Sequence, residues 1–331
     1  MSATCTQASA AHGEPLTATA ATARTWLLLE QPGPWGAKAL TSSHLDPAVG
    51  RALEDRTART GVRVALIRRP GRHADPRGQA GPRHPAAAIR PAEPRRRVIL
   101  AHTAPDDPWI RTADLADPAA VAALADLDFT ALGAGDPRGF GVPYDGPPLA
   151  FVCTNARRDR CCALLGRPLA SELAASYGTE HVWEVTHLGG HRFAPTMLVL
   201  PHGYTYGRLD GGQAKGVLEA ARDGRVPFPP CRGRSAWDRP GQAAELAVRA
   251  LTGEDRADAL TVTSTEEAPA GRDDGDGDGA TWTVAVAHRD GRAWRVAVVR
   301  RASGPPRPES CGAALGTPAR MDVEDVHEVT V

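Results

Sequence analysis

The first half of the chain alternates between short apolar runs and longer mixed segments. The apolar runs predict three strands, at residues 25–30, 62–67 and 98–102. Asp46, followed by a proline, has the features of a helix N-cap, and Gly61 follows the end of the helix predicted there. Asp117, also followed by proline, predicts a second, short helix. Residues 70–96 are rich in Pro, Arg, Gly and His without periodicity, which predicts a mobile surface loop.

The second half repeats this succession more clearly. Its apolar runs predict strands at residues 148–152, 181–186, 197–200 and 204–209. Apolar side chains at helical spacing predict a helix from Cys162 to about Tyr177, and they are Leu164, Leu165, Leu169 and Leu173. A second helix is predicted over residues 212–222. The order strand, helix, strand, then strand, strand, helix is that of a thioredoxin-like domain, in which helices cover a mixed sheet.

The composition of the chain changes after residue 230. A helix is predicted at residues 241–251 and a strand at 260–263. An acidic, glycine-rich stretch predicts a linker over 266–279. Strands at 281–288 and 293–301 flank Arg-Asp-Gly-Arg, which is typical of a β-hairpin, and alternating apolar residues predict that one hairpin face is packed. The proline-rich tail after Ser303 is expected to be irregular.

These patterns predict an α/β (α+β) protein of three parts. Residues 1–145 form an N-terminal α/β domain, and its matching element order indicates a degenerate thioredoxin-like repeat. Residues 146–230 form a thioredoxin-like domain, and residues 231–331 form a small extension of a helix and a β-hairpin. A chain of 331 residues is long enough for two domains and a smaller unit.

Charge and composition exclude several classes of protein. The chain has 39 basic and 39 acidic residues, whereas general nucleic-acid or membrane-surface binders carry a basic excess. No apolar run approaches the roughly 18 residues of a membrane span. The N-terminus lacks the pattern of a secretory signal, and six cysteines are too few for a disulfide scaffold. We therefore expect a cytoplasmic protein that binds neither nucleic acid nor membranes, in which grouped cysteines serve metal or redox chemistry.

Two cysteines and two histidines are expected to meet at one edge of the second sheet. Cys153 ends one predicted strand, Cys162 starts the following helix, and His187 and His191 come directly after the next strand. Loops that follow neighbouring parallel strands emerge at the same end of a sheet. Two consecutive glycines between the histidines allow the backbone to curl, so that both rings can point inward. The set predicts a metal centre.

The spacing of these cysteines and histidines is compatible with two kinds of metal centre. Structural zinc favours cysteines two to four residues apart, and eight residues separate Cys153 from Cys162, although His-x3-His is compatible with half a zinc site. A 2Fe-2S cluster is wider, suits a longer cysteine spacing, and is held by two cysteines and two histidines in Rieske centres. The first candidate cofactor is therefore a 2Fe-2S cluster, and zinc is the alternative.

This segment resembles the sucrase/ferredoxin-like family. The resemblance is carried by Cys153-x8-Cys162 with Arg158-Asp159-Arg160 inside it, and by His187-Leu188-Gly189-Gly190-His191-Arg192. It implies a thioredoxin-like ferredoxin domain in which Cys153, Cys162, His187 and His191 hold a 2Fe-2S cluster. It also makes neighbours of the ligands candidates for cluster binding, and these are Arg158, Asp159, Arg160, Gly189, Gly190 and Arg192.

The predicted function is electron transfer, with a protein or small-molecule donor and acceptor. Neutral imidazoles in place of thiolates make reduction easier, and an exposed ring nitrogen would couple it to a proton. We expect a redox carrier more than a stand-alone enzyme. Cys161 departs from the family pattern, in which a basic residue is common at this position. Its thiol could replace that of Cys162 as a ligand, or form a disulfide with Cys162 in the cluster-free protein. The alternatives are thus a thioredoxin-like thiol–disulfide oxidoreductase that uses Cys161 and Cys162, or a structural zinc module.

Overall fold

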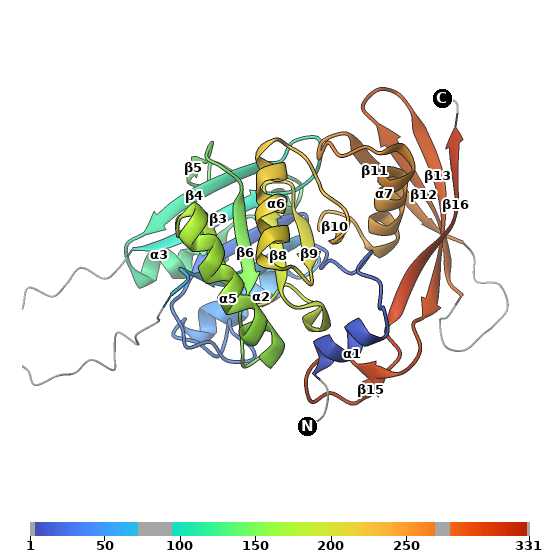
Figure 1. Ribbon diagram of the computed structural model, residues 1–331. Coiled ribbons are helices and arrows are strands. Elements are labelled where there is room, and N and C mark those ends of the chain that lie inside the picture. Colours follow the sequence, from blue (N-terminus) through green and yellow to red (C-terminus); the bar gives the residue numbers. More distant parts are fainter. Residues whose placement is uncertain (1–3, 72–94, 269–278, 330–331) are drawn as a thin grey trace, which may run out of the picture.

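One large mixed sheet forms the centre of the molecule (Figure 1). The computed structural model describes residues 4–71, 95–268 and 279–329. The ten strands of this sheet lie in the order β10-β9-β8-β6-β7-β2-β1-β3-β4-β5. Their bounds are β1 Thr25–Glu30, β2 Val62–Arg68, β3 Arg96–His102, β4 Trp109–Leu115, β5 Val142–Pro143, β6 Leu149–Cys153, β7 Val182–Val185, β8 Thr196–Leu200, β9 Tyr204–Gly207 and β10 Cys231–Arg234. The predicted α/β (α+β) class is confirmed.

Two sets of four strands within this sheet have the same connectivity. β1 is parallel to β2 and antiparallel to β3, and β3 is antiparallel to β4. In the same way β6 is parallel to β7 and antiparallel to β8, and β8 is antiparallel to β9. The equivalent strands β2 and β7 pair antiparallel and join the two sets, and Arg68 binds Glu184 across the join at 2.6 Å. Each set has the strand order of a thioredoxin-like domain.

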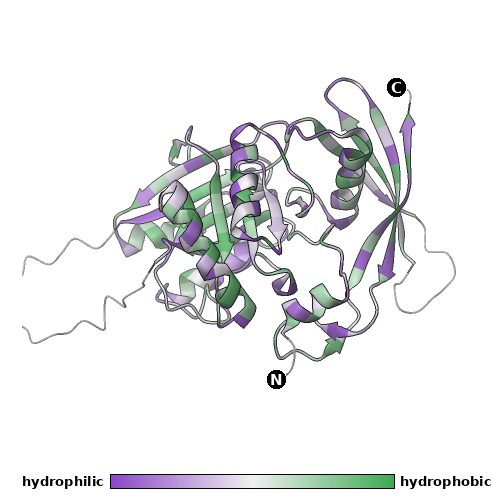
Figure 2. Cartoon of the chain, viewed as in Figure 1, coloured by the Kyte–Doolittle hydropathy of each residue, from purple (hydrophilic) through white to green (hydrophobic). Residues whose placement is uncertain are grey.

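The helices between β1 and β10 pack on one face of the large sheet. The helices are α1 Cys5–Ala11, α2 Pro47–Thr57, α3 Pro118–Ala122, α4 Phe129–Gly133, α5 Arg160–Tyr177, α6 Gly211–Arg222 and α7 Arg239–Thr252. Leu173 of α5 and Val217 of α6 join one core cluster with Val152 of β6. Leu53 of α2 belongs to another cluster, with strand residues of β1 and β3. Hydrophobic residues accordingly gather on the central strands, as Figure 2 shows.

The helix starts follow the capping signals of the sequence. The Asp46 and Asp117 side chains accept backbone hydrogen bonds at the starts of α2 and α3, as predicted. α5 begins two residues before the predicted start at Cys162, because Asp159 is its N-cap. The predicted apolar face of this helix is only half right: Leu169 and Leu173 are buried, whereas Leu164 and Leu165 are 65% and 41% exposed.

A second sheet packs on α7 in the C-terminal part. It has the order β11-β12-β13-β16, with bounds β11 Leu260–Glu267, β12 Thr281–His288, β13 Ala293–Ala302 and β16 Ala319–Val329. The predicted hairpin is present as β12 and β13. Val284, Val286 and Trp294 pack against Ala244 and Val248 of α7, which confirms that one hairpin face is covered.

Several expectations for loops need correction. The tail after Ser303 is not irregular, because β16 pairs with the whole of β13 through Ala293–Ala302 and β14 (Arg307–Pro308) pairs with β15 (Leu315–Gly316). The first two residues of the predicted 266–279 linker belong to β11. Residues 269–278, and residues 72–94 of the predicted 70–96 loop, lie outside the described residues. Among the described helices, none combines the length and the apolar character of a membrane span.

Candidate functional site

The parallel pair β6 and β7 brings Cys153 and His187 to one edge of the large sheet. Cys153 is the last residue of β6 and lies opposite Val185, the last residue of β7. The chain leaves β7 through Thr186 and reaches His187 at once. The Cys153 sulfur is buried, 3.8 Å from the Thr186 carbonyl oxygen. The topology predicted from the sequence thus produces the expected juxtaposition.

Close packing of α5 on β6 places Cys162 beside this edge. Cys162 lies in the first turn of α5 and is buried in the same core cluster as Cys153. Gly166, one turn further along, lies against the end of the strand. A Cβ at Gly166 would be only 2.2 Å from the carbonyl oxygen of Cys153, so the helix can approach the strand this closely only at a glycine.

A tight loop brings the two histidine rings close to each other and the ring of His191 to a thiol. Gly189 and Gly190 have φ angles of +75° and +69°, in the left-handed region that glycine adopts without strain. A short 3₁₀ turn, η2 (His191–Phe193), follows. The two imidazole rings lie 4.8 Å apart between centroids, and Nδ1 of His191 is 3.3 Å from the Cys162 sulfur. The structure therefore brings these two pairs of predicted ligands, the two thiols and the two rings, together.

The thiols of Cys153 and Cys162 interact, and the interaction shifts their pKa values in opposite directions. It lowers the pKa of Cys153, and backbone N–H groups of Leu188 and Asn155 act in the same direction. The same interaction, together with burial, raises the pKa of Cys162. Cys153 is therefore the thiol of the pair that loses its proton more readily. The thiolate is the form of cysteine that binds metals.

Both histidines are held neutral. Burial, with the neighbouring His191 and Arg63 acting in the same direction, lowers the pKa of His187 to about 3. Burial also lowers the pKa of His191, although Asp159 opposes that effect. A neutral imidazole has a free lone pair for a metal. Nδ1 of His187 is buried, and in the described part of the chain it has no hydrogen-bond partner.

Arg232 is a buried cation that supports the histidine loop. Its side chain is fully buried and donates hydrogen bonds to the carbonyl oxygen of Gly189 at 3.1 Å and to the Thr19 hydroxyl at 3.0 Å. Its charge contributes to the low pKa of Cys153 and of both histidines. A Cβ at Gly190 would lie 2.3 Å from the Arg232 guanidinium, so any larger residue at this position would clash with the cation.

A cavity of about 550 Å³ leads from solvent to His187. Arg63, Arg158 and Lys38 line it together with one acidic residue, Glu54, so its lining carries a net positive charge. Arg158 is exposed, and its charge contributes to lowering the pKa of both histidines. Arg158 was predicted from the sequence. Arg63 and Arg232 were not, because they lie on other strands, β2 and β10, and no motif surrounds them.

The other predicted neighbours of the ligands have different partners. Arg192 forms ion pairs with Glu14 at 2.7 Å and Glu309 at 2.9 Å, and so connects the histidine loop to both terminal segments. Arg160 is exposed. Asp159 caps α5 through the backbone N–H of Cys161 at 2.8 Å. Its carboxylate faces a group of cysteines that does not include the predicted ligands.

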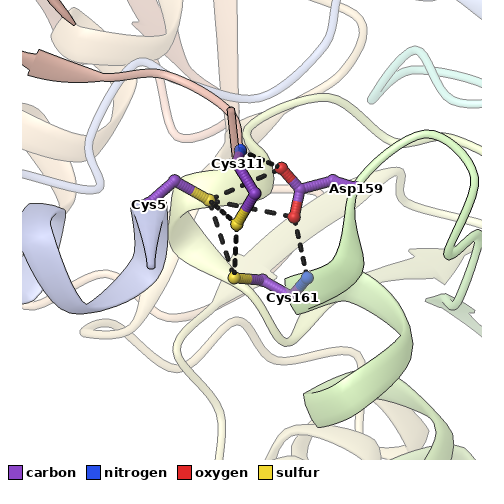
Figure 3. A group of neighbouring side chains, drawn as sticks. All are labelled: Cys5, Asp159, Cys161 and Cys311. Carbon is purple, nitrogen blue, oxygen red and sulfur yellow. Dashed lines mark hydrogen bonds between the residues drawn. The ribbon is translucent and has the colours of Figure 1, made fainter. Parts of the chain in front are cut away.

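Cys161 points toward two thiols that are distant in the sequence, as Figure 3 shows. Its sulfur lies 3.7 Å from that of Cys5 and 3.2 Å from that of Cys311. The group of Cys5, Asp159, Cys161 and Cys311 could hold a metal ion, since one ligand atom from each lies within 4.8 Å of all the others. Sequence reasoning missed this group, because Cys5 and Cys311 stand alone in the sequence and carry no ligand spacing.

Comparisons with known proteins identify a family but no individual relative. The family model described as sucrase/ferredoxin-like matches residues 16–233. No curated protein matches the chain, and no solved structure does. The matched region runs from the segment before β1 to β10 and includes both thiols and both histidines of the sheet edge.

Proposed function

The chain belongs to the sucrase/ferredoxin-like family, and from that premise we propose that it is an electron carrier with a 2Fe-2S cluster at the sheet edge. Cys153 and Cys162 hold one iron, and His187 and His191 hold the other. The observation that carries the proposal is the meeting of two buried thiols with two neutral imidazoles, with Nδ1 of His191 3.3 Å from the Cys162 sulfur.

The donor set fits this group. The buried, unpartnered Nδ1 of His187 is a polar atom that a metal would satisfy, and burying it without a partner otherwise costs free energy. Cys153 is the thiol of the pair that loses its proton more readily, and binding a metal would release the thiol protons. Cysteine thiolates and imidazoles are the ligands found in bis-histidine 2Fe-2S centres.

The protein's own residues set the charge of the site. Bound there, the cluster supplies a one-electron redox centre. Two neutral rings in place of two thiolates leave less negative charge around the irons, and the buried Arg232 guanidinium stabilises an added electron. Burial itself excludes water, which strengthens these charge interactions.

His187 is the ring suited to couple a proton to reduction. It is half-buried and lines the cavity, whereas His191 is 9% exposed. If Nδ1 of His187 held the metal, Nε2 would carry the ring proton and could exchange it with solvent. A more negative centre holds that proton more tightly, so the reduction potential falls as the pH rises.

The net positive charge of the cavity beside His187 favours an acidic partner. Lys38, Arg63 and Arg158 surround the route to His187, and the neighbouring Arg157 is also exposed. Such a patch steers negatively charged molecules by long-range attraction. The electron donor and acceptor are accordingly acidic proteins or anionic small molecules, and their association weakens at high ionic strength.

Iron and acid-labile sulfide analysis, combined with redox titration, tests the proposal. We expect about two irons and two sulfides per chain and a potential that falls between about pH 6 and about pH 10. His187→Cys should keep a cluster whose potential is lower and no longer responds to pH at this ring. Lys215→Gln, a charge change on α6, is the control and should change neither property.

The alternatives give different results. Zinc without iron at the thiols and imidazoles would contradict the electron carrier and favour the structural zinc module. A colourless protein that reduces disulfides would favour the thiol–disulfide oxidoreductase. The placement of the two adjacent cysteines speaks against that enzyme, because Cys162 faces Cys153 whereas Cys161 faces Cys5 and Cys311.

A further inference from the structure

Three thiols from remote parts of the chain converge beside the start of α5 (Figure 3). Cys5 begins α1, Cys161 lies in the first turn of α5, and Cys311 lies between β14 and β15. Their sulfur atoms are separated by 3.7 Å (Cys5 to Cys161), 3.2 Å (Cys161 to Cys311) and 3.5 Å (Cys311 to Cys5). All three cysteines are free, and Cys5 and Cys161 are buried.

A carboxylate completes the group. Oδ2 of Asp159 is 3.5 Å from the Cys5 sulfur. The backbone N–H of Cys161 donates to its Oδ1 at 2.8 Å, and the backbone N–H of Cys311 donates to its Oδ2 at 2.7 Å. These two bonds fix the carboxylate toward the thiols while each oxygen keeps a lone pair. Asp159 is itself buried, and the thiols around it solvate its negative charge poorly.

These dimensions are close to those of a tetrahedral zinc site. With Zn–S bonds of about 2.3 Å, the sulfur atoms of such a site lie about 3.8 Å apart, and a zinc-bound oxygen lies about 3.5 Å from each sulfur. We propose that Cys5, Cys161, Cys311 and Asp159 bind a single zinc ion, separate from the Cys153, Cys162, His187 and His191 centre. The thiol triangle needs to widen by only a few tenths of an ångström to receive it.

The local charges suit a divalent ion. Three thiolates and one carboxylate bring four negative charges, and zinc neutralises two of them. The exposed Arg160 guanidinium lies beside the group, where its positive charge interacts with Cys311. Each thiol loses its proton when the metal binds, so zinc binding releases protons and weakens as the solution becomes more acidic.

The zinc site links the N-terminal and C-terminal segments to each other beside the histidine loop. The Thr6 hydroxyl, one residue after Cys5, donates to the carbonyl oxygen of His191 at 3.3 Å. Arg192 holds Glu14 on one side and Glu309 on the other. A metal that ties Cys5 and Cys311 to the start of α5 therefore closes a loop of nearly the whole chain, which is the kind of crosslink that stabilises a fold most. This role is independent of whether iron occupies the neighbouring centre.

Metal analysis of the full chain tests the proposal. The protein, purified after zinc is added and excess metal removed, is expected to hold about one zinc per chain. The double variant Cys5→Ser/Cys311→Ser should lose that zinc and keep the iron and sulfide of the other centre. Cys231→Ser, at a buried thiol of β10 far from the group, is the matched control and should keep the zinc. Zinc retained by the double variant would overturn the proposal.

X-ray absorption at the zinc edge gives a second test on the unaltered chain, in case the double variant does not fold. Three sulfur neighbours and one oxygen support the assignment. Two sulfur and two nitrogen neighbours would place zinc at the histidine centre and overturn it. Fully reduced protein that takes up no zinc at the three thiols would also overturn it.

Discussion

At the scale of single residues, the proposed ligands could be predicted from the sequence, whereas the residues that support them could not. Cys153, Cys162, His187 and His191 stand at the ends of local elements, so their residue types and spacing predicted their meeting. Arg232 reaches the same site from β10 through hydrogen bonds to Gly189 and Thr19. Cys5 and Cys311 meet across 306 residues. Such contacts are set by tertiary packing, and no local spacing encodes them.

Gly190→Ala tests the fit between the histidine loop and Arg232. The new Cβ would lie 2.3 Å from the guanidinium, at a φ of +69°. Gly189→Ala is the matched control: its φ is +75°, and its Cβ would meet only Ala21 at 3.7 Å. Urea unfolding should show a loss of about 1–2 kcal/mol for Gly189→Ala, from backbone strain, and roughly 3 kcal/mol for Gly190→Ala. Equal losses would mean that Arg232 is not held against the loop.

At the scale of elements, the amphipathic helices and the buried strands were predictable, and edge segments were not. α2 and β1 follow strong local signals, namely an Asp-Pro start and a continuous apolar run. β16 was missed because, as an edge strand, it has only a few apolar positions, such as Met321 and Val323, between charged residues. α1 has no apolar periodicity, and its order depends on contacts with the histidine loop and the C-terminal segment.

Gly166→Ala tests how α5 is seated on β6. Its Cβ would lie 2.2 Å from the Cys153 carbonyl oxygen, which is backbone and cannot move aside. We expect a loss of about 1–3 kcal/mol in the free energy of unfolding and lower iron content, because Cys162 moves with the helix. Gly216→Ala on α6 is the control: no atom lies within 4 Å of its Cβ, and we expect a gain of about 0.5–1 kcal/mol. Unchanged stability of Gly166→Ala would contradict the close seating.

At the scale of the whole molecule, two equivalent sets of strands share one sheet, and the thiols and imidazoles proposed as metal ligands belong to the second set. The position equivalent to Cys153 is the end of β1, at Glu30, and the segment after β2 begins with Arg69 and Pro70. Glu30 and Arg69 are neither thiols nor imidazoles, whereas His73 and His84 further along this segment lie outside the described residues. Within the described residues, the first set extends the sheet and supplies Arg63 to the cavity beside His187. The repeated element order of the sequence already indicated this relationship.

Acid should destabilise the molecule through its buried histidines. Burial, with Arg234 acting in the same direction, lowers the pKa of His202 to about 4, whereas in the unfolded chain it is about 6.5. Between these values only the unfolded state binds the proton, so the stability present above about pH 6.5 falls as the pH drops, by at most about 1.4 kcal/mol per pH unit.

His202→Asn removes this titration. Between about pH 6.5 and about pH 4.5, the unaltered chain should lose roughly 2 kcal/mol more stability than His202→Asn, measured by urea unfolding at each pH. His327→Asn changes a ring that is 76% exposed on β16 and serves as the control, with the same pH dependence as the unaltered chain. If His202→Asn and the unaltered chain lost the same stability over this pH range, the folded state would protonate the His202 ring as easily as the unfolded chain does.

Pulsed electron paramagnetic resonance of the reduced protein, with histidine labelled by ¹⁵N, tests the 2Fe-2S centre most directly. The account predicts a paramagnetic centre with two strongly coupled imidazole nitrogens, and the loss of one of them in His187→Cys and of the other in His191→Cys. A paramagnetic iron–sulfur signal without strong nitrogen coupling, or a fully metal-loaded protein with no such signal on reduction, would contradict it.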